Sequence, residues 1–280
     1  MKVVNTAAEL REEVETQRKE GRTVGFVPTM GALHAGHVSL VDRSKMEGCY
    51  TVSSIFVNPT QFNDKNDLKN YPRMPEQDLE LLKAHGVDLV FMPSVKEMYP
   101  EEDTRTFDFG EIEKVMEGAR RPGHFNGVAQ VVSKLFDAVQ PDKAYFGEKD
   151  FQQVAIIRDM VKQLHFPVEI VACPIVRDVD GLALSSRNML LSPAQRESAP
   201  AIFRALNSAQ KVGTTAAVAD LKRQVIDEVN SHAELEVEYF DIVDADSLQS
   251  VSSWEDSNNI YGCIAVKVGA IRLIDNIRLK

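Results

Sequence analysis

The chain has 280 residues, of which 44% are hydrophobic and 26% are charged, a composition typical of a globular protein with room for two domains of about 150 residues each. Its formal net charge of −10 argues against an extended nucleic-acid-binding surface, which needs clustered lysine and arginine, but is compatible with a basic pocket for one nucleotide. Three distant cysteines without a CxxC pair argue against a zinc site or a disulfide framework.

The N-terminal residues lack an apolar signal region, and no segment approaches 18 consecutive apolar residues. We therefore expect a cytoplasmic protein that has no membrane partner and keeps its cysteines reduced.

Strand and helix patterns alternate through the first 175 residues. A capping box formed by Thr6 and Glu9 predicts a first helix that stops at Gly21. The strands expected after it are residues 23–29, 50–57, 87–92, 143–146 and 168–175, and the expected helices are 35–47, 75–85, 111–117, 125–139 and 150–164. This alternation predicts an α/β fold, in which a parallel sheet has helices on both faces.

The pattern changes near residue 176. Helices are expected at 193–212 and 217–230, and strands at 235–243, 260–268 and 271–279. Only Gly269 and Ala270 separate the last two strands, which predicts an antiparallel hairpin. We place a domain boundary here, between residues 1–175 and a smaller α+β domain of residues 176–280.

The sequence PTMGALHAGH at 28–37 lies where the first strand of the sheet turns into its helix. Ligands of open α/β sheets bind beyond the carboxyl ends of the strands, and a helix start there offers free N–H groups to phosphate. His34 and His37 share one face of the first turn, so two imidazoles are available to donate hydrogen bonds to phosphate oxygens. The alternatives are a capping or packing pair, and a two-histidine metal site that lacks a nearby third ligand.

The HxGH pattern at this place resembles the HIGH-type nucleotide-binding signature. Nucleotidylyltransferases, class I aminoacyl-tRNA synthetases and pantothenate synthetases share this signature, and all direct an attack at the α-phosphate of a nucleotide. The motif indicates the superfamily and leaves the substrate open.

A second segment, YFGEKDFQQ at 145–153, lies at another strand-to-helix junction and should face the same crevice. Lys149 is a flexible cation suited to phosphate, and Asp150 is a candidate N-cap that also suits a ligand hydroxyl. Gln153 lies one turn further on the same side. In isolation, a solvated loop followed by a cap explains this segment equally simply.

A third segment, LSSRN at 184–188, combines two hydroxyls with a guanidinium, a set that suits a triphosphate. It resembles the KMSKS-type loop of the same superfamily, with Arg187 in place of lysine. A polar turn followed by a cap is the alternative.

Two more segments are weaker signals. FVNPTQF at 56–62 ends the second strand, and its Gln61 offers a donor and an acceptor to a hydroxyl-bearing acid, although an ordinary loop is the simpler interpretation. RPGHFNGV at 121–128 joins a basic cluster to a helix start, and is either an anion-facing loop or an exposed basic turn.

Taken together, these five segments resemble the pantothenate synthetase family, the pantoate–β-alanine ligases. The motifs PTMGALHAGH, FVNPTQF, RPGHFNGV, YFGEKDFQQ and DGLALSSRN occur in the order and spacing of that family, and the resemblance spans most of residues 23–190. Residues after about 195 match in length and general character only. Asn126 and Gln130 depart from the polar or charged residue and the threonine found in many members, which leaves their local contacts in doubt.

The resemblance implies a Rossmann-like, doubly wound domain that binds ATP and pantoate, a C-terminal domain that closes over the active site, and a homodimer. It implies that pantoate attacks the α-phosphate of ATP to give pantoyl adenylate and pyrophosphate. β-Alanine then attacks the activated carbonyl to give pantothenate and AMP. Mg²⁺ is expected to enter on the ATP phosphates, so we expect no dedicated protein ligands for a metal.

On this resemblance, the catalytic candidates are His34, His37, Lys149 and Arg187. Gln61 and Gln153 are expected to bind pantoate, and Gln61 also to contact β-alanine. The expected ATP-binding positions are Met30, Gly31, Ala32, Leu33, His34, Ala35, Gly36, His37, Gly147, Glu148, Lys149, Asp150, Val176, Leu184, Ser185, Ser186 and Arg187.

The residues accept this chemistry because it needs no protein nucleophile, and neither a GxSxG elbow nor a cysteine beside a candidate base occurs. Three alternatives stay open at this point. They are a nucleotidylyltransferase, a class I tRNA synthetase, against which the acidic charge argues, and a non-catalytic nucleotide-binding module.

Overall fold

The computed structural model describes residues 1–280, and the chain divides into two compact units. Two short segments from before residue 175 belong to the second unit, where buried Gln152 joins them by accepting from the Glu117 N–H (2.8 Å) and donating to the Ile112 carbonyl (2.7 Å). The first unit comprises Met1–Phe109, Arg121–Glu148 and Gln153–Pro174, and the second comprises Gly110–Arg120, Lys149–Gln152 and Ile175–Lys280.

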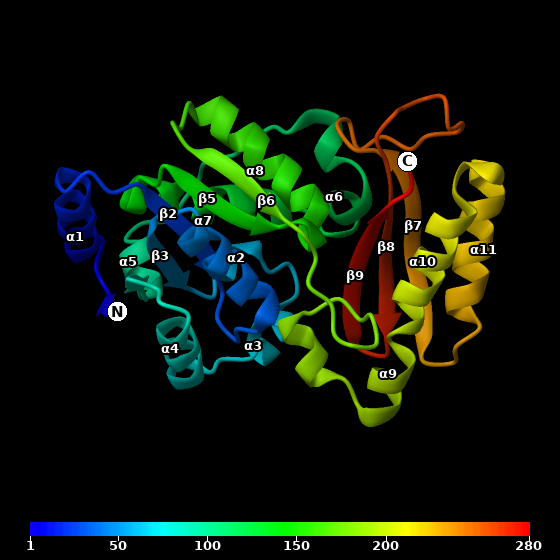
Figure 1. The fold of residues 1–280 in the computed structure, drawn as a ribbon, viewed down its shortest axis with the longest axis horizontal. Coiled ribbons are helices and arrows are strands. Elements are labelled where there is room, and N and C mark those ends of the chain that lie inside the picture. The colour runs from blue at the N-terminus through cyan, green and yellow to red at the C-terminus, as the bar shows by residue number, and fades with distance from the viewer. The chain divides into compact units, whose positions relative to one another are not determined.

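The first unit is built on a six-stranded parallel sheet with the order β1-β4-β3-β2-β5-β6 (Figure 1). The direction of winding reverses between β2 and β5, which makes their carboxyl ends the topological switch point of the sheet. This order confirms the predicted Rossmann-like parallel sheet and adds the short edge strand β1, which the sequence analysis missed. The strands are β1 Lys2–Val4, β2 Val24–Thr29, β3 Tyr50–Ile55, β4 Leu89–Phe91, β5 Lys143–Gly147 and β6 Glu169–Cys173.

Helices cover both faces of this sheet, because alternate residues of a strand point to opposite sides. Phe26 of β2 meets Phe136 of helix α7 edge-on, with 6.3 Å between ring centroids. Its neighbour Val27 packs in the other direction, in a buried cluster with Leu40 and Val41 of helix α2. The capping box of Thr6 and Glu9 is confirmed at the start of α1. The main helices of this unit are α1 Ala7–Lys19, α2 Ala35–Met46, α4 Pro75–Ala84, α7 His124–Val139 and α8 Phe151–Leu164, the last of which begins in the second unit.

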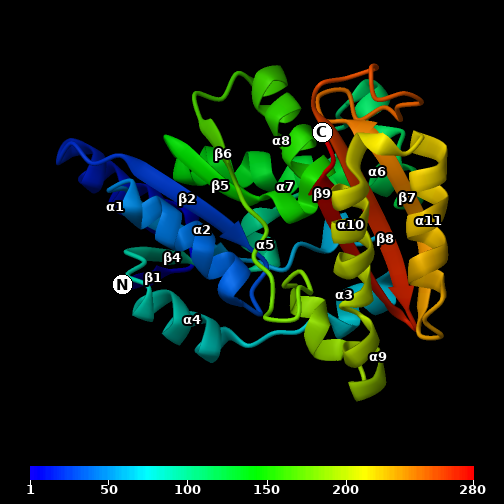
Figure 2. The ribbon, with the colours of Figure 1, turned by 45° about the vertical axis from the view of Figure 1, so that its right-hand side comes forward.

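The second unit is a three-stranded antiparallel sheet with the order β7-β8-β9. Helices α10 and α11 lie along the strands (Figure 2), and their residues Ile202 and Leu221 share a buried core with Phe240 and Ile264 of the sheet. The predicted hairpin at Gly269 is confirmed, as is the α+β character of this part of the chain. The elements are α10 Ala201–Val212, α11 Val218–Asn230, β7 Leu235–Asp244, β8 Ile260–Val268 and β9 Ile271–Arg278.

Two predicted helices are wrong as continuous elements. The helix expected at 193–212 is broken into α9 Pro193–Ser198 and α10, because Pro200 has no N–H to donate within a helix. The helix expected at 111–117 is a 3₁₀ turn, η2 Gly110–Glu113, followed by α6 Met116–Arg120. Met116 interrupts it with a left-handed φ of 45°.

No helix of the chain combines the length and apolar character needed to cross a bilayer. The remaining elements are short. They are α3 Lys65–Asn70 and α5 Val95–Met98, with the 3₁₀ helices η1 Pro59–Gln61, η3 Glu148–Asp150, η4 Ser186–Leu190 and η5 Gly213–Thr215.

One carboxylate joins α2 to the strand beside the switch point. Glu47 caps the C-terminus of α2, and it accepts from Lys143 Nζ (2.7 Å) and Tyr145 Oη (2.9 Å) of β5 and from Arg43 Nε (2.5 Å) of its own helix. These hydrogen bonds, that of Lys143 first, lower the pKa of Glu47 from 4.5 to about 2. Ionised Glu47 therefore helps to fix α2 against β5.

A carboxyl group whose pKa is lowered by folding stabilises the protein above its unfolded pKa, and this stabilisation is lost as the pH falls toward the folded value. For Glu47 this window runs from pH 4.5 down to about pH 2. We predict that Glu47→Gln lowers the urea midpoint at pH 7 and flattens its decline on acidification. Glu20→Gln, at a half-exposed carboxylate that pairs with Arg22 at 3.5 Å, is the control and should behave as wild type. An equally steep acid dependence in Glu47→Gln would contradict this role.

Candidate active site

The loop that follows β2 turns back on itself through two left-handed residues. Gly31 has a φ of 81° and Ala32 a φ of 50°, and this conformation is the reason that glycine suits position 31. Thr29 Oγ1 fixes the start of the loop, donating to the Ser54 carbonyl of β3 at 2.6 Å and accepting from the Gly31 N–H at 3.2 Å.

Asp78, in the first turn of α4, holds the other side of this loop. Its side chain is only 3% exposed, and its two carboxylate oxygens accept from the N–H groups of Ala32 (2.9 Å) and Leu33 (2.7 Å). A Cβ on Gly31 would lie 2.9 Å from Asp78 Oδ2, so the carboxylate and the glycine fit each other closely. The sequence analysis missed Asp78, because no local motif contains it.

The two histidines of the HxGH pattern cap α2 reciprocally. His34 is the N-cap, and its Nδ1 accepts from the Gly36 N–H at 3.1 Å. The Nδ1 of His37 accepts in turn from the His34 N–H at 3.4 Å, and the ring centroids are 4.1 Å apart. Because each Nδ1 is an acceptor, the neutral form of each ring carries its proton on Nε2. The capping interpretation is confirmed. It uses only the Nδ1 atoms, and the phosphate-binding interpretation stays a prediction.

The expectation that this helix start offers free N–H groups is wrong for several residues. The Leu33 N–H donates to Asp78, that of Gly36 to His34 Nδ1, and that of His37 to the His34 carbonyl at 2.8 Å. Three peptide N–H groups at this turn therefore already have partners within the chain.

Gln61 lies at the end of η1, beside the loop after β2. Its Nε2 is 3.3 Å from the Met30 sulfur, and its Oε1 accepts from Asn58 Nδ2 at 3.1 Å. The segments PTMGALHAGH and FVNPTQF, which follow neighbouring strands, are thus in direct contact. Gln61 is half-buried, as a side chain at the wall of a ligand site would be.

The RPGHFNG segment contacts the backbone of Thr60 and Gln61. Buried His124 contacts the Gln61 carbonyl through Nδ1 (2.8 Å) and Arg121 through Nε2 (3.1 Å), so Nδ1 carries the proton that is donated to the carbonyl. Gly127 allows the backbones to approach, since a Cβ there would lie 2.4 Å from the Thr60 carbonyl oxygen. The RPGHFNG segment therefore packs against the η1 turn and holds it in place. Its predicted role as an anion-facing loop stays a prediction.

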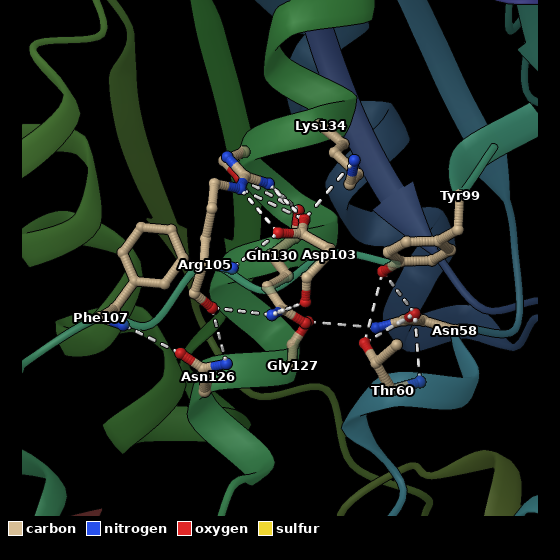
Figure 3. A network of polar contacts seen from close by, with 11 residues as sticks. Asn58, Thr60, Tyr99, Asp103, Arg105, Phe107, Asn126, Gly127, Gln130 and Lys134 are labelled. Carbon is tan, nitrogen blue, oxygen red and sulfur yellow. Dashed lines mark hydrogen bonds and ion pairs between the residues drawn. The ribbon is translucent and has the colours of Figure 1, made fainter. Parts of the chain in front are cut away.

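Asn126 and Gln130, where the sequence departs from the family pattern, hold the segment of residues 103–107 against α7 (Figure 3). The Asn126 amide pairs with the Phe107 N–H (2.9 Å) and the Arg105 carbonyl (3.2 Å). Gln130 Nε2 donates to the carbonyls of Asp103 (2.9 Å) and Arg105 (2.8 Å). Their local contacts are therefore structural.

At the carboxyl end of β5, Gly147 and Glu148 belong to the first unit and Lys149 to the second. Lys149 Nζ lies 3.3 Å from Asp150 Oδ1, and the Lys149 carbonyl accepts from Asn276 Nδ2 of β9 at 3.2 Å. The helix α8 begins at Phe151 and not at Asp150, which lies in the η3 turn.

The two adjacent glutamines of this motif have different environments. Gln152 is 3% exposed and is engaged by backbone groups, whereas Gln153 is half-buried. The predicted contact of Gln153 with pantoate stays a prediction.

The LSSRN segment leads into the 3₁₀ helix η4, which begins at Ser186 in the second unit. Ser185 caps it by accepting from the Arg187 N–H at 3.3 Å, and Asn188 Nδ2 donates to the Ala183 carbonyl at 3.0 Å. The Leu184 N–H donates to the Val176 carbonyl at 3.0 Å, which joins two positions expected to contact ATP. No group of three or more histidine, cysteine, aspartate or glutamate side chains is placed to hold a metal ion.

The chain matches a known protein family over almost its whole length. The family model described as pantoate-beta-alanine ligase matches residues 2–278. The chain belongs to this family. It is therefore a ligase of pantothenate biosynthesis, and this decides against the nucleotidylyltransferase, tRNA synthetase and non-catalytic alternatives that the HxGH pattern left open.

Curated relatives match over nearly their full length. The chain is 56% identical to the pantothenate synthetase of Bacteroides thetaiotaomicron over 280 residues, covering 100% of this chain and 99% of the relative. It is 55% identical to that of Porphyromonas gingivalis strain W83 over 278 residues, with 99% of each protein covered.

Two solved structures are similar in fold as well. The pantothenate synthetase of Thermus thermophilus superposes with a TM-score of 0.94 at 46% identity, covering 100% of this chain and 99% of that one. The pantoate-beta-alanine ligase of Francisella tularensis, complexed with beta-gamma ATP and beta-alanine, has a TM-score of 0.84 at 36% identity and covers 99% and 97%.

We predict that Asp78→Ala destabilises the protein by about 3 kcal/mol or more, because it leaves two peptide N–H groups without their charged acceptor. Chemical denaturation measures this change in the free energy of unfolding. Glu76→Ala, at an exposed residue in the same helical turn, is the matched control and should cost less than about 0.5 kcal/mol. Equal effects of the two substitutions would refute the anchoring role of Asp78.

Proposed function

We propose that this enzyme condenses pantoate with β-alanine at the expense of ATP, through a pantoyl-adenylate intermediate, and releases AMP and pyrophosphate. The reciprocal pair of His34 and His37 carries the proposal, because it begins the helix that follows β2, one of the two strands at the sheet's switch point, where open α/β folds bind nucleotides. The Francisella tularensis relative, complexed with beta-gamma ATP and beta-alanine, supports the two co-substrates.

The chemistry explains why ATP is needed. A carboxylate is a poor acyl donor, because oxide would have to leave. In the first step a carboxylate oxygen of pantoate bonds to the α-phosphorus, and the bond from that phosphorus to the bridging oxygen breaks with release of pyrophosphate. In the second step the amine of β-alanine attacks the carbonyl carbon, AMP leaves with the bonding electron pair, and the amine loses a proton.

The residues have distinct proposed roles. His34 and His37 donate hydrogen bonds to phosphate oxygens as negative charge develops during the first step. Lys149 and Arg187 are the cations that neutralise the phosphates, Lys149 as a compact point charge and Arg187 through its bidentate fork. The loop from Met30 to Leu33 supplies the shape that Thr29 and Asp78 impose on it. Mg²⁺ is proposed to arrive on the ATP phosphates as part of the substrate.

Pantoate is proposed to bind at Gln61 and Gln153. Its carboxylate and two hydroxyls match amides that both donate and accept, and a site built to hydrogen-bond a hydroxyl discriminates strongly against analogues that lack it. Gln61 is also proposed to contact β-alanine. The closure of the C-terminal domain, the homodimer and the cytoplasmic location stay predictions.

The adenylate predicts a specific partial reaction. Labelled pyrophosphate should exchange into ATP when pantoate and Mg²⁺ are present and β-alanine is absent. The rate of exchange is measured as the label that appears in ATP, after the ATP has been separated from pyrophosphate by filter binding or chromatography. Exchange that appears only after β-alanine is added would show that the two steps do not occur in this order.

The same assay tests the histidines. His34→Asn and His37→Asn should each slow exchange by about 10²–10³-fold, the usual cost of one lost transition-state donor. His85→Asn is the matched control, since His85 pairs with Asp42 at 3.0 Å on another part of the unit and should leave the rate unchanged.

A further inference from the structure

Asn58, the N-cap of the η1 turn, is buried in the first unit, and its side-chain amide is hydrogen-bonded on both sides. It is 1% exposed, and its amide contacts two backbone groups of fixed polarity. The Gly127 carbonyl, which only accepts, lies 3.1 Å from one amide atom, and the Thr60 N–H, which only donates, lies 3.4 Å from the other. The first atom must therefore be Nδ2 and the second Oδ1.

This polarity determines what Tyr99 does (Figure 3). Its hydroxyl lies 2.8 Å from Asn58 Oδ1, so it must donate to that oxygen. Burial raises the pKa of the Tyr99 hydroxyl, which therefore stays protonated at neutral pH. Lys134 Nζ lies 5.3 Å from the centre of the tyrosine ring and 3.5 Å from Asp103 Oδ2, contacts that hold the ring and the cation in place.

The orientation of the Asn58 amide also determines the orientation of the Gln61 amide. Asn58 has two amide hydrogens, one donated to the Gly127 carbonyl and one to Gln61 Oε1 at 3.1 Å. Asn58 thus has no hydrogen left for a ligand, and the Gln61 oxygen is already accepting. The Nε2–H₂ group of Gln61 therefore lies on the side of the Met30 sulfur, 3.3 Å away, and it is the part of the amide that can donate to a ligand.

We propose that Tyr99 is a positioning residue for the acid substrate: together with the Gly127 carbonyl and the Thr60 N–H it holds the Asn58 amide, and Asn58 in turn holds the Gln61 amide so that Gln61 presents a hydrogen-bond donor. The group of the substrate that meets Gln61 is therefore an acceptor, a carboxylate or hydroxyl oxygen. This inference rests on the proposed binding of pantoate at Gln61. It extends the site to a residue 41 positions along the chain from Asn58 and outside every motif.

Tyr99→Phe tests this relay of hydrogen bonds, which runs from Tyr99 through Asn58 to Gln61. The substitution removes one hydroxyl and keeps the ring that contacts Lys134. We expect the KM for pantoate to rise about threefold to tenfold, with the KM for ATP and the thermal midpoint nearly unchanged. In a Gln61→Ala background the same substitution should not raise the KM for pantoate further, since the side chain that Asn58 positions has been removed. Tyr50→Phe is the control. Tyr50 is the first residue of β3, at the end of the strand away from Asn58, and its hydroxyl donates to Glu13.

A second variant tests the polarity itself. Gln61→Glu keeps an oxygen for Asn58 Nδ2 but replaces the outward donor by a charged acceptor, so its KM for pantoate should exceed that of Gln61→Ala. Pantoate binding by Gln61→Glu as tight as in wild type would overturn the orientation. A normal pantoate KM in Tyr99→Phe, alongside a raised KM in Gln61→Ala, would overturn the relay alone. A normal KM in Gln61→Ala would overturn both the relay and the proposed pantoate site.

Discussion

The loop after β2 depends on a carboxylate that comes from 46 residues further along the chain. Asp78 accepts the Ala32 and Leu33 N–H groups inside the fold, at the place where two left-handed residues turn the backbone. Without this acceptor the N–H groups of Ala32 and Leu33 would lose their charged partner, which costs more than most single contacts provide. With it, the loop leads directly into α2, whose N-cap is His34.

From this anchor the polar groups of the first unit set one another's orientation. Peptide groups have fixed donors and acceptors, and they determine which end of each ambivalent side chain faces which way. The Gly36 and His34 N–H groups fix the tautomers of the two histidines, and the Gly127 carbonyl and Thr60 N–H fix the Asn58 amide. Backbone groups thus determine the orientation of side chains to which we assign roles in the proposed reaction, and fixed donors of this kind are the form that electrostatic preorganisation takes in enzymes.

The sequence predicted those parts of the fold that local pattern controls. Strand and helix alternation indicated the parallel sheet, and the Thr6 capping box and the Gly269 hairpin were predicted from neighbouring residues. The break at Pro200 was open to prediction, because proline cannot donate within a helix. The break at Met116 was not, because its left-handed backbone has no local signature. Asp78 and Tyr99 were missed since each acts on residues more than 40 positions away, a relation that appears only when the sheet brings strand ends together.

The central claim is that the carboxylate of pantoate attacks the α-phosphate of ATP. The most direct measurement uses pantoate whose carboxylate carries a heavy oxygen isotope, with ATP, Mg²⁺ and β-alanine, and mass spectrometry of the nucleotide and phosphate products. We predict that one labelled oxygen appears in AMP and none in pyrophosphate. Label in inorganic phosphate or pyrophosphate, or its loss to water with none in AMP, would contradict an adenylate and would require another mode of activation.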